Sequence, residues 1–186
     1  MIRKTLGLSA LCLSLALATP ARGQTVSRLF LEVRGGAVVP TFDIADVATT
    51  GGGYGGTLGY HLNNRFTVLG EFDTGLHQDK ATSTVDITTR HYMAKLGYQL
   101  TPSRDIGWDV AVNLGAGAVS FKADVPNAST DTYFAINAGA KITYNFSARI
   151  GLVLSPQGDI AFSDKNTLGS STAWVWPFSA GLRIKF

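Results

Sequence analysis

Apolar residues alternate with polar or small residues along most of the chain after residue 28, and this two-residue period constrains the fold more than any other feature. In segment 107–121, for example, Trp108, Val110 and Val112 are separated by polar or small residues. Successive side chains of a β-strand point to opposite faces of the sheet. Because the spacing typical of helices never dominates, the period predicts an all-β chain.

Eight segments carry this alternation, and the connections between them alternate in length. We place the connections at 39–52, 63–64, 77–84, 101–106, 122–130, 146–147 and 161–171. The Asn63-Asn64 pair is typical of a tight turn. Short turns at one end and longer loops at the other are the asymmetry of an up-and-down membrane barrel. The sequence therefore predicts an all-β, eight-stranded antiparallel up-and-down transmembrane β-barrel over residues 24–186.

The polar or small face of these segments is rich in glycine, and this decides which face is inside. Alternation alone also fits a soluble barrel, whose outer wall would carry many Lys and Glu. Here that face instead contains Gly36, Gly55, Gly59, Gly97, Gly115, Gly117, Gly139, Gly151 and Gly181. Glycine weakens a strand unless another group must approach closely. The interior of an eight-stranded barrel is only wide enough for side chains, so we place this face in the lumen and the apolar face against lipid.

Charged residues share the inward face with the glycines. We predict a lumen charge network of Glu32, Arg34, Glu71, Asp73, Lys95, Asp109, Lys141, Arg149 and Arg183. Buried charges persist only when they are paired. The network is therefore expected to form a salt-bridged plug, and a narrow conduit lined by the same charges is the alternative.

Aromatic residues lie near both ends of the apolar face, as in the girdles of membrane barrels. We expect Tyr60, Tyr98, Trp108, Tyr144 and Phe186 near the periplasmic interface, and Tyr54, Phe134, Trp174 and Trp176 near the outer one. Arg90 lies on the outward register near the outer rim. It is a candidate contact for lipopolysaccharide phosphates, and ordinary solvation at the rim is the alternative.

Residues 1–23 have the pattern of a secretory signal peptide. Arg3 and Lys4 precede a mainly apolar run, and Ala21-Arg22-Gly23 offers a small-x-small cleavage site before Gln24. The run is shorter than the ~20 residues that a membrane-spanning helix needs. The only cysteine, Cys12, falls in this segment, so we expect no disulfide in the mature chain.

Removal of this segment changes the charge balance. Three of the 16 basic residues and none of the 13 acidic residues lie in it, so 13 of each remain and the net charge falls from +3 to zero. Nucleic-acid binding has a clustered basic surface as its signature. We therefore exclude nucleic acid as a partner.

The signal peptide, the eight amphipathic segments and the alternating end of the chain resemble the small outer-membrane β-barrel proteins of Gram-negative bacteria, of the OmpA transmembrane-domain, OmpX and NspA type. The terminal pattern consists of Phe178, Ala180, Leu182, Ile184 and Phe186. In that family such an ending implies recognition by the barrel assembly machinery. The resemblance also implies a monomer in the cell outer membrane, in contact with its lipid and lipopolysaccharide. It names no extracellular ligand.

No catalytic motif stands out. The deacylases among such barrels carry a His-x-Ser-Asn motif, whereas His61, His77 and His91 are followed by other residues. We expect His61 and His91 to be hydrogen-bonded in the lumen and His77 to lie on a loop. Histidines on different strands also lack metal-ligand spacing. We therefore predict a non-enzymatic protein without catalytic residues, metal or other cofactor.

The predicted function is a structural or surface-interaction role, such as binding or adhesion, through the outer loops of a porin-like barrel. Loops on a rigid scaffold are where function commonly lies. Two other functions stay open: a narrow pore for small or hydrophobic solutes, and a lipid A-modifying enzyme.

Overall fold

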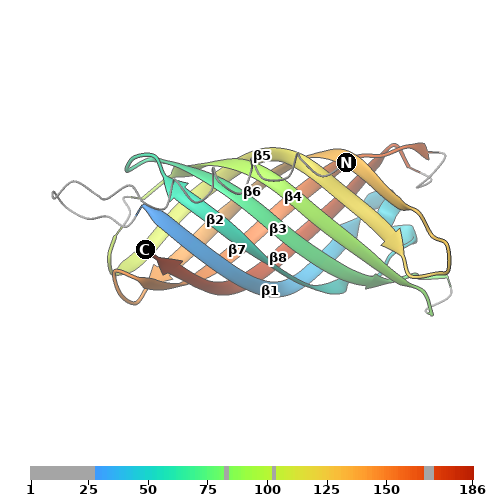
Figure 1. The fold of residues 1–186 in the computed structure, drawn as a ribbon, viewed down its shortest axis with the longest axis horizontal. Helices are drawn as coiled ribbons and strands as arrows, with labels where there is room; N and C mark the ends of the chain where they lie inside the picture. The colour runs from blue at the N-terminus through green and yellow to red at the C-terminus, as the bar shows by residue number, and fades with distance from the viewer. Residues whose placement is uncertain (1–27, 82–83, 102–103, 166–169) are drawn as a thin grey trace, which may run out of the picture.

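The computed structural model describes residues 28–81, 84–101, 104–165 and 170–186, which form a closed barrel of eight strands (Figure 1). Each strand pairs antiparallel with its neighbours in sequence, and β8 closes the barrel on β1. The strands are β1 (Leu29–Thr41), β2 (Gly51–His61), β3 (Phe66–Gln78), β4 (Asp86–Gln99), β5 (Gly107–Ala123), β6 (Thr130–Asn145), β7 (Ile150–Phe162) and β8 (Thr172–Lys185). The predicted fold class is confirmed. The predicted signal peptide, 1–23, lies outside the described residues.

Two tight turns, 62–65 between β2 and β3 and 146–149 between β6 and β7, lie at the end of the barrel that contains the C-terminus (Figure 1). The Asn63 side-chain oxygen accepts hydrogen bonds from the backbone N–H groups of Arg65 and Phe66 at 2.8 and 2.9 Å. Ser147 Oγ accepts from the N–H groups of Arg149 and Ile150 in the same manner. These side-chain oxygens take the place of carbonyl acceptors on the neighbouring strand. They therefore determine where the strands end.

The first loop at the opposite end is shorter and more ordered than predicted. β1 continues to Thr41, so the connection is 42–50 and not 39–52. It contains a 3₁₀ helix, η2 (Phe42–Asp46), and Thr49 N–H donates to the Gln78 carbonyl at 2.9 Å. The loop therefore lies along the end of β3. No helix in the described ranges is both long and apolar enough to cross a membrane.

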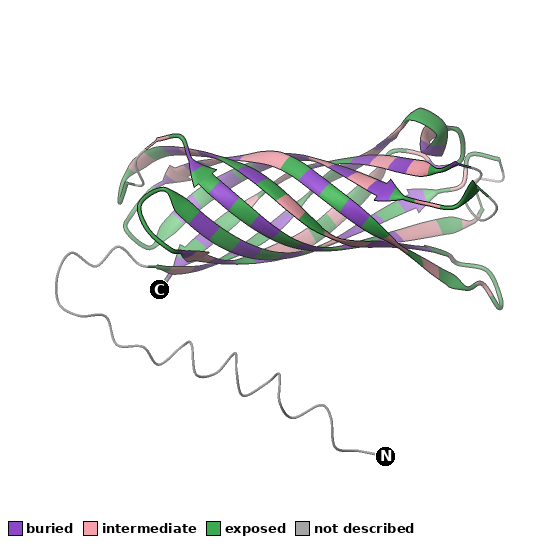
Figure 2. Ribbon diagram, turned by 90° about the horizontal axis from the view of Figure 1, so that it is seen from above, coloured by how far each residue is buried: buried purple, intermediate pink, exposed green. Residues whose placement is uncertain are grey.

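Burial alternates along most of the length of the strands (Figure 2). On β7, for example, Gly151, Val153 and Ser155 are buried, whereas Leu152 and Leu154 are exposed. The exposed positions are almost all apolar and form the outer wall. The inward positions include most of the buried polar side chains. The sequence-based assignment of the two faces is thus confirmed.

Two inward glycines show why the lumen face needs glycine. A Cβ atom on Gly59 would lie 2.0 Å from the ring of Phe30, its neighbour across the β1–β2 pair. A Cβ on Gly55 would lie 2.0 Å from Asp73 Oδ1. The missing side chains give space to the larger side chains that fill a narrow barrel. The glycine-rich stretch 51–59 is therefore barrel wall.

Candidate functional site

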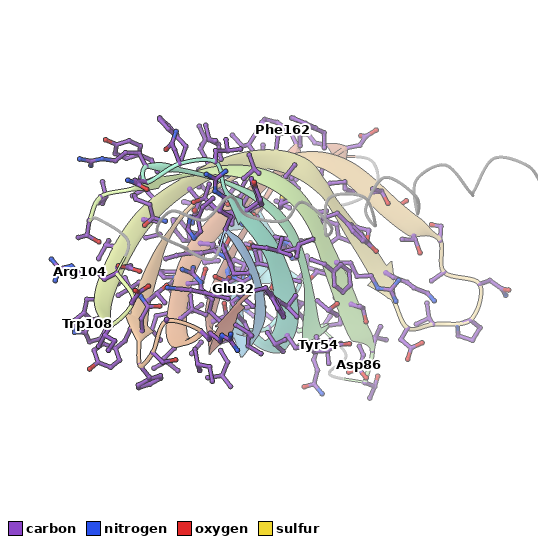
Figure 3. All side chains as sticks on the ribbon, turned by 60° about the vertical axis from the view of Figure 1, so that its left-hand side comes forward. Glu32, Tyr54, Asp86, Arg104, Trp108 and Phe162 are labelled. Atoms are coloured by element: carbon purple, nitrogen blue, oxygen red, sulfur yellow. The ribbon has the colours of Figure 1, made fainter. Side chains whose placement is uncertain are left out.

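A cluster of ion pairs occupies the middle of the lumen, and Glu32 of β1 lies at its centre (Figure 3). Glu32 is completely buried. Its Oε1 accepts hydrogen bonds from Arg183 Nε and Nη2 of β8 at 2.8 and 2.6 Å, and its Oε2 accepts one from Lys141 of β6. The guanidinium of Arg183 also lies over the ring of Phe30 at 4.4 Å. Glu32 therefore joins β1 to a neighbouring strand and to the far side of the barrel.

Arg34 forms the second junction of this cluster. Its Nη2 lies 2.9 Å from Glu71 Oε2 and 3.0 Å from Asp73 Oδ1, both on β3. Its Nη1 donates to Ser155 Oγ of β7 at 2.9 Å. A planar guanidinium with five N–H donors suits such branching contacts. Arg34 thus connects two carboxylates on one side of the lumen to β7 on the other.

Two lysines complete the cluster. Lys95 of β4 donates to Glu71 and, across the lumen, to Gln157 of β7. Lys141 lies 3.2 Å from Glu71 Oε2 and donates to Thr57 Oγ1 of β2 at 3.0 Å. Because these contacts cross the barrel instead of following its wall, they obstruct the bore. Side chains of seven strands take part, and only β5 contributes none among the described residues.

The structure brings seven of the nine residues of the predicted charge network together in this cluster. Asp109 is buried in the lumen but lies in a separate group near the barrel end that contains the C-terminus, where it accepts hydrogen bonds from Asn145 Nδ2 at 2.6 Å and from Arg104 N–H at 3.0 Å. Arg149 does not face the lumen. It is exposed in the turn between β6 and β7, because the bonds to Ser147 Oγ end the strand pair before residue 149.

A polar layer follows toward the outer end of the lumen. His91 Nδ1 lies 2.7 Å from Asp159 Oδ2, close but poorly aligned for a hydrogen bond. Asn137 Nδ2 donates to Asp159 Oδ1 at 2.5 Å. Thr89 Oγ1 lies 3.3 Å from His91 Nε2 and 3.3 Å from His77 Nε2. His91 is inward as predicted, as is His61, whose Nδ1 lies 2.8 Å from Thr67 Oγ1.

The prediction that His77 lies on a loop is wrong. His77 is on β3, faces inward and is only 3% exposed. Its Nδ1 contacts the Thr49 carbonyl at 2.9 Å. The first loop pairs with the end of β3 and extends this strand past the predicted boundary.

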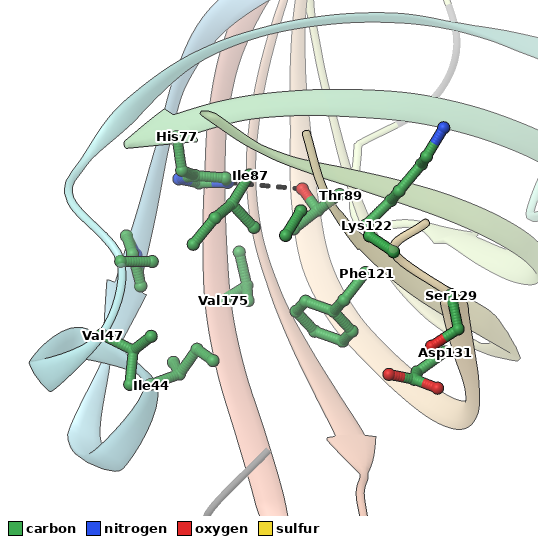
Figure 4. A pocket seen from close by; sticks show the side chains of 14 residues that line it. Ile44, Val47, His77, Ile87, Thr89, Phe121, Lys122, Ser129, Asp131 and Val175 are labelled. Atoms are coloured by element: carbon green, nitrogen blue, oxygen red, sulfur yellow. Dashed lines mark hydrogen bonds between the residues drawn. The ribbon is translucent and has the colours of Figure 1, made fainter. Parts of the chain in front are cut away.

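The outermost part of the lumen is apolar, which the sequence analysis did not predict. The buried side chains there are Ile44, Phe121, Ala135, Ala161 and Ala173, and the apolar cluster continues inward to Val119 and Met93. Above them lies a cavity of about 320 Å³ (Figure 4). It is lined by β1, β3, β4, β5, β6, β8, the first loop and residues 128–129. Its polar side includes His77 and Thr89. The inward parity of Phe121 and Val175 could have been read from the sequence, but the inward position of Ile44 depends on the loop fold.

The outer wall carries its aromatic residues in groups toward both ends. The ring centroids of Trp108 and Tyr144 lie 4.9 Å apart near the barrel end that contains the C-terminus, and Phe134 and Phe162 stack at 6.0 Å near the other end. Arg90 is exposed on β4. It stands between Thr74 of β3 and Ser120 of β5 in the strand register.

The residues of the predicted assembly signal alternate outward along β8. Phe178, Ala180, Leu182, Ile184 and Phe186 are all exposed, whereas Arg183 and Lys185 between them are buried. Phe186 N–H donates to the Leu29 carbonyl at 2.9 Å, which extends the closure of the barrel to its last residue. The structure thus places the five residues on one outward-facing stripe.

The sequence analysis missed the contacts that five polar residues make inside the lumen: Thr57, Asn137, Ser155, Gln157 and Asp159. All five are buried at inward positions. The two-residue alternation of the sequence could therefore have identified them as lumen residues. Across the described residues, no group of three His, Cys, Asp or Glu side chains is placed to hold a metal ion.

Comparisons with known proteins agree with this architecture. The family profile described as "Outer membrane protein beta-barrel domain" matches residues 8–186. No curated protein sequence matches the chain. Among solved structures, Neisserial surface protein A (NspA) is similar with a TM-score of 0.68 and 12% identity, over 89% of this chain and 100% of that one.

Two further solved structures share the fold at low identity. The N-terminal β-barrel domain of Pseudomonas aeruginosa OprF has a TM-score of 0.56 and 15% identity, over 84% of this chain and 97% of that chain. Ail, the attachment invasion locus protein of Yersinia pestis, has a TM-score of 0.51 and 16% identity over the same shares, 84% and 97%. At these identities the likeness shows the fold alone.

Proposed function

Because the chain belongs to the outer membrane protein beta-barrel family, we propose that this Gram-negative outer-membrane barrel acts through its extracellular end and not as an open pore. In this proposal the tight turns and both ends of the barrel chain face the periplasm, and the first loop with η2 faces outward. The role is structural and interactive: the wall anchors the protein in the membrane, and the outer end presents a binding surface.

The observation that carries the proposal is the central ion-pair cluster. A solute that followed the lumen would have to displace Glu32, Arg34 and Lys141, which are all buried. Glu32 pairs with Lys141 of β6, and Arg34 bonds to Ser155 of β7, so both contacts cross the barrel. Separating a buried ion pair costs several kcal/mol, about 3–5 kcal/mol when one partner is left alone. This cost disfavours passage through the lumen and directs attention to the outer end.

The ordered first loop supports an interaction at that end. Phe42 has φ of +57°, a backbone conformation rarely adopted by a bulky residue, and its ring contacts Trp174 with centroids 5.3 Å apart. Asp43 Oδ2 accepts a hydrogen bond from Ser170 Oγ at 2.8 Å. Such strain persists where surrounding contacts fix it, and it concentrates at binding sites and other functional regions.

Intact cells provide the test of this role. Residues 42–50 are replaced by a Gly/Ser linker of equal length, and binding of the cells to immobilised host-matrix proteins and envelope glycans is measured. Ail, an attachment protein by name, shares this fold, so attachment is the first role to assay. We expect the loop variant to lose the binding seen with the unmodified protein.

The matched control replaces the turn 146–149 in the same manner, because this turn would face the periplasm. Heat-modifiable gel migration verifies that both variants fold. If deletion of the whole protein leaves cell binding unchanged, the interaction role is rejected.

We also propose that Arg90 contacts lipopolysaccharide phosphates. It is exposed on the outer wall, and a guanidinium can bind a phosphate through two parallel hydrogen bonds. The variant Arg90→Ala is expected to co-purify with less lipopolysaccharide. Arg65→Ala, at an exposed turn on the opposite end, is the matched control, and equal lipopolysaccharide in all three proteins would remove the assignment.

An enzymatic role receives less support. The chain Thr89, His91 and Asp159 has the order of hydroxyl, imidazole and carboxylate, but a hydrolase also needs free donors for the oxyanion. The backbone around Thr89 lies in a strand paired on both sides. Mass spectrometry of lipid A from an overexpressing strain tests this alternative, and loss of an acyl chain would support it.

A further inference from the structure

The outer mouth of the lumen contains a cavity that differs from the rest of the interior. Nine of its lining residues are apolar, and its volume is about 320 Å³. Protein interiors contain few voids larger than a water molecule, and this volume corresponds to about ten water molecules of the liquid. Known ligand pockets begin at roughly 300 Å³ and are mainly apolar with a few polar groups.

The cavity ends blindly toward the periplasm. Below it the buried side chains of Val119 and Ala135, both 0% exposed, close the lumen. The layer of His91, Asp159 and Asn137 lies next to them, Met93 follows His91 along β4, and the ion-pair cluster comes after it. A molecule that enters from outside is therefore held at the mouth and not passed through.

The first loop forms one wall of the cavity. Ile44 of η2 is only 6% exposed and points inward, and Val47 follows it along the same wall (Figure 4). The positive φ of Phe42 and the bond from Ser170 to Asp43 hold η2 in this position. The strained loop thus serves to complete an apolar enclosure.

The polar groups of the cavity indicate what kind of molecule fits. The His77 and Thr89 side chains, joined by a 3.3 Å contact, lie on one side (Figure 4). Asp131 and Ser129 lie at the rim, and the ammonium of Lys122 points away from the cavity (Figure 4). A carboxylate at the rim disfavours an anionic ligand, whereas the imidazole and hydroxyl offer a partner to one neutral polar group.

We propose that this mouth pocket binds a small, uncharged and mainly apolar molecule that carries one hydroxyl or carbonyl group. Its apolar body packs against Ile44, Phe121 and Val175, and its polar group bonds to Thr89 or His77. The proposal rests on the proposed function, since it names a ligand class for the extracellular end. The ligand arrives from the external medium.

The test measures binding of 1-naphthol to the full barrel in nanodiscs with perdeuterated lipid chains. Isoleucine methyl groups are followed by NMR, because Ile44 and Ile87 line the pocket whereas Ile136, Ile150 and Ile184 face lipid. We expect saturable shifts at Ile44 and Ile87 only. 1-Naphthoate has the same rings with a carboxylate. Its dissociation constant is expected to be higher than that of 1-naphthol by about tenfold or more.

Two variants make the test specific. Ala123→Phe places a ring in the pocket and is expected to weaken naphthol binding by about tenfold or more. Ala138→Phe adds the same ring to the lipid-facing wall, where Ala138 is exposed, and is expected to leave binding unchanged. Heat-modifiable migration checks that both barrels are folded.

Absence of saturable shifts at Ile44 and Ile87, or equal shifts at the lipid-facing isoleucines, would overturn the proposal. A second arm uses protonated lipid chains without the probe, and cross-relaxation from these chains to Ile44 would assign the pocket to bilayer lipid and overturn it as well. Failure of the proposed function is distinct, because it would appear as unchanged cell binding on deletion of the protein.

Discussion

Replacing Glu32 by Gln removes one negative charge from the centre of the lumen and keeps the size of the side chain. Among the described residues, the central cluster has four cations, Arg34, Lys95, Lys141 and Arg183, and three carboxylates, Glu32, Glu71 and Asp73. The change leaves four cations with two carboxylates. Arg183 loses its ion-pair partner, since Glu32 is the only carboxylate within ion-pair distance of it there.

The expected magnitude follows from burial. Glu32 is 0% and Arg183 4% exposed, so water does not compensate the lost charge. Leaving a buried partner unpaired costs about 3–5 kcal/mol, and we expect this loss in the free energy of unfolding of E32Q. The exposed carboxylate of Asp86 supplies the control, because D86N should stay within about 0.5 kcal/mol of the unmodified protein.

Urea-induced unfolding in bilayers, followed by tryptophan fluorescence and gel migration, measures these values. Lys141→Met is expected to cost less than E32Q, because it leaves three cations with three carboxylates. The double variant should be more stable than the sum of the single losses predicts, by roughly 0.5–3 kcal/mol. If E32Q loses no more stability than D86N, Glu32 does not compensate the buried cations and the reasoning fails.

Further perturbations address the packing, the membrane-facing wall and the shielding of the cluster. Gly59→Ala should destabilise the barrel by about 1–3 kcal/mol, because its Cβ would meet the Phe30 ring at 2.0 Å, whereas Gly70→Ala has nothing within 4 Å and should be neutral; equal unfolding midpoints would contradict this packing. Leu114→Arg, on the exposed middle of β5, should lower the free energy of unfolding in bilayers by about 2–4 kcal/mol. Ile150→Arg, at the start of β7, should lower it by about 0–1 kcal/mol. The reverse order would argue against the assigned depths. Raising NaCl from about 0.05 to 0.5 M should leave the unfolding midpoint nearly unchanged because buried pairs are weakly screened, and a large decrease would show that the cluster is hydrated.

The barrel itself could be predicted from the sequence because its evidence is local. The two-residue period determines which side chains share a face. The length of each alternating segment gives the approximate extent of the strand. Glycine on the polar face then decided which face is inside. These features need no knowledge of which residues meet across the lumen.

The partners within the lumen could not be predicted in the same way. Lys141 and Glu32 are 109 positions apart, and their contact depends on the tilt and stagger of strands around a closed barrel. Arg149 shows where alternation alone fails. The two-residue period places it on the inward face, but it lies in the turn beyond the end of the β6–β7 pair. The mouth pocket depends on an irregular backbone at Phe42, for which alternation gives no signal.

Electrical conductance of the purified barrel in planar bilayers tests most directly the central claim that ion pairs close the lumen. We expect at most small and rare current steps, because Lys95, Lys141 and Arg34 bind partners across the bore. Large, steady channels from a folded, heat-modifiable preparation would contradict the account.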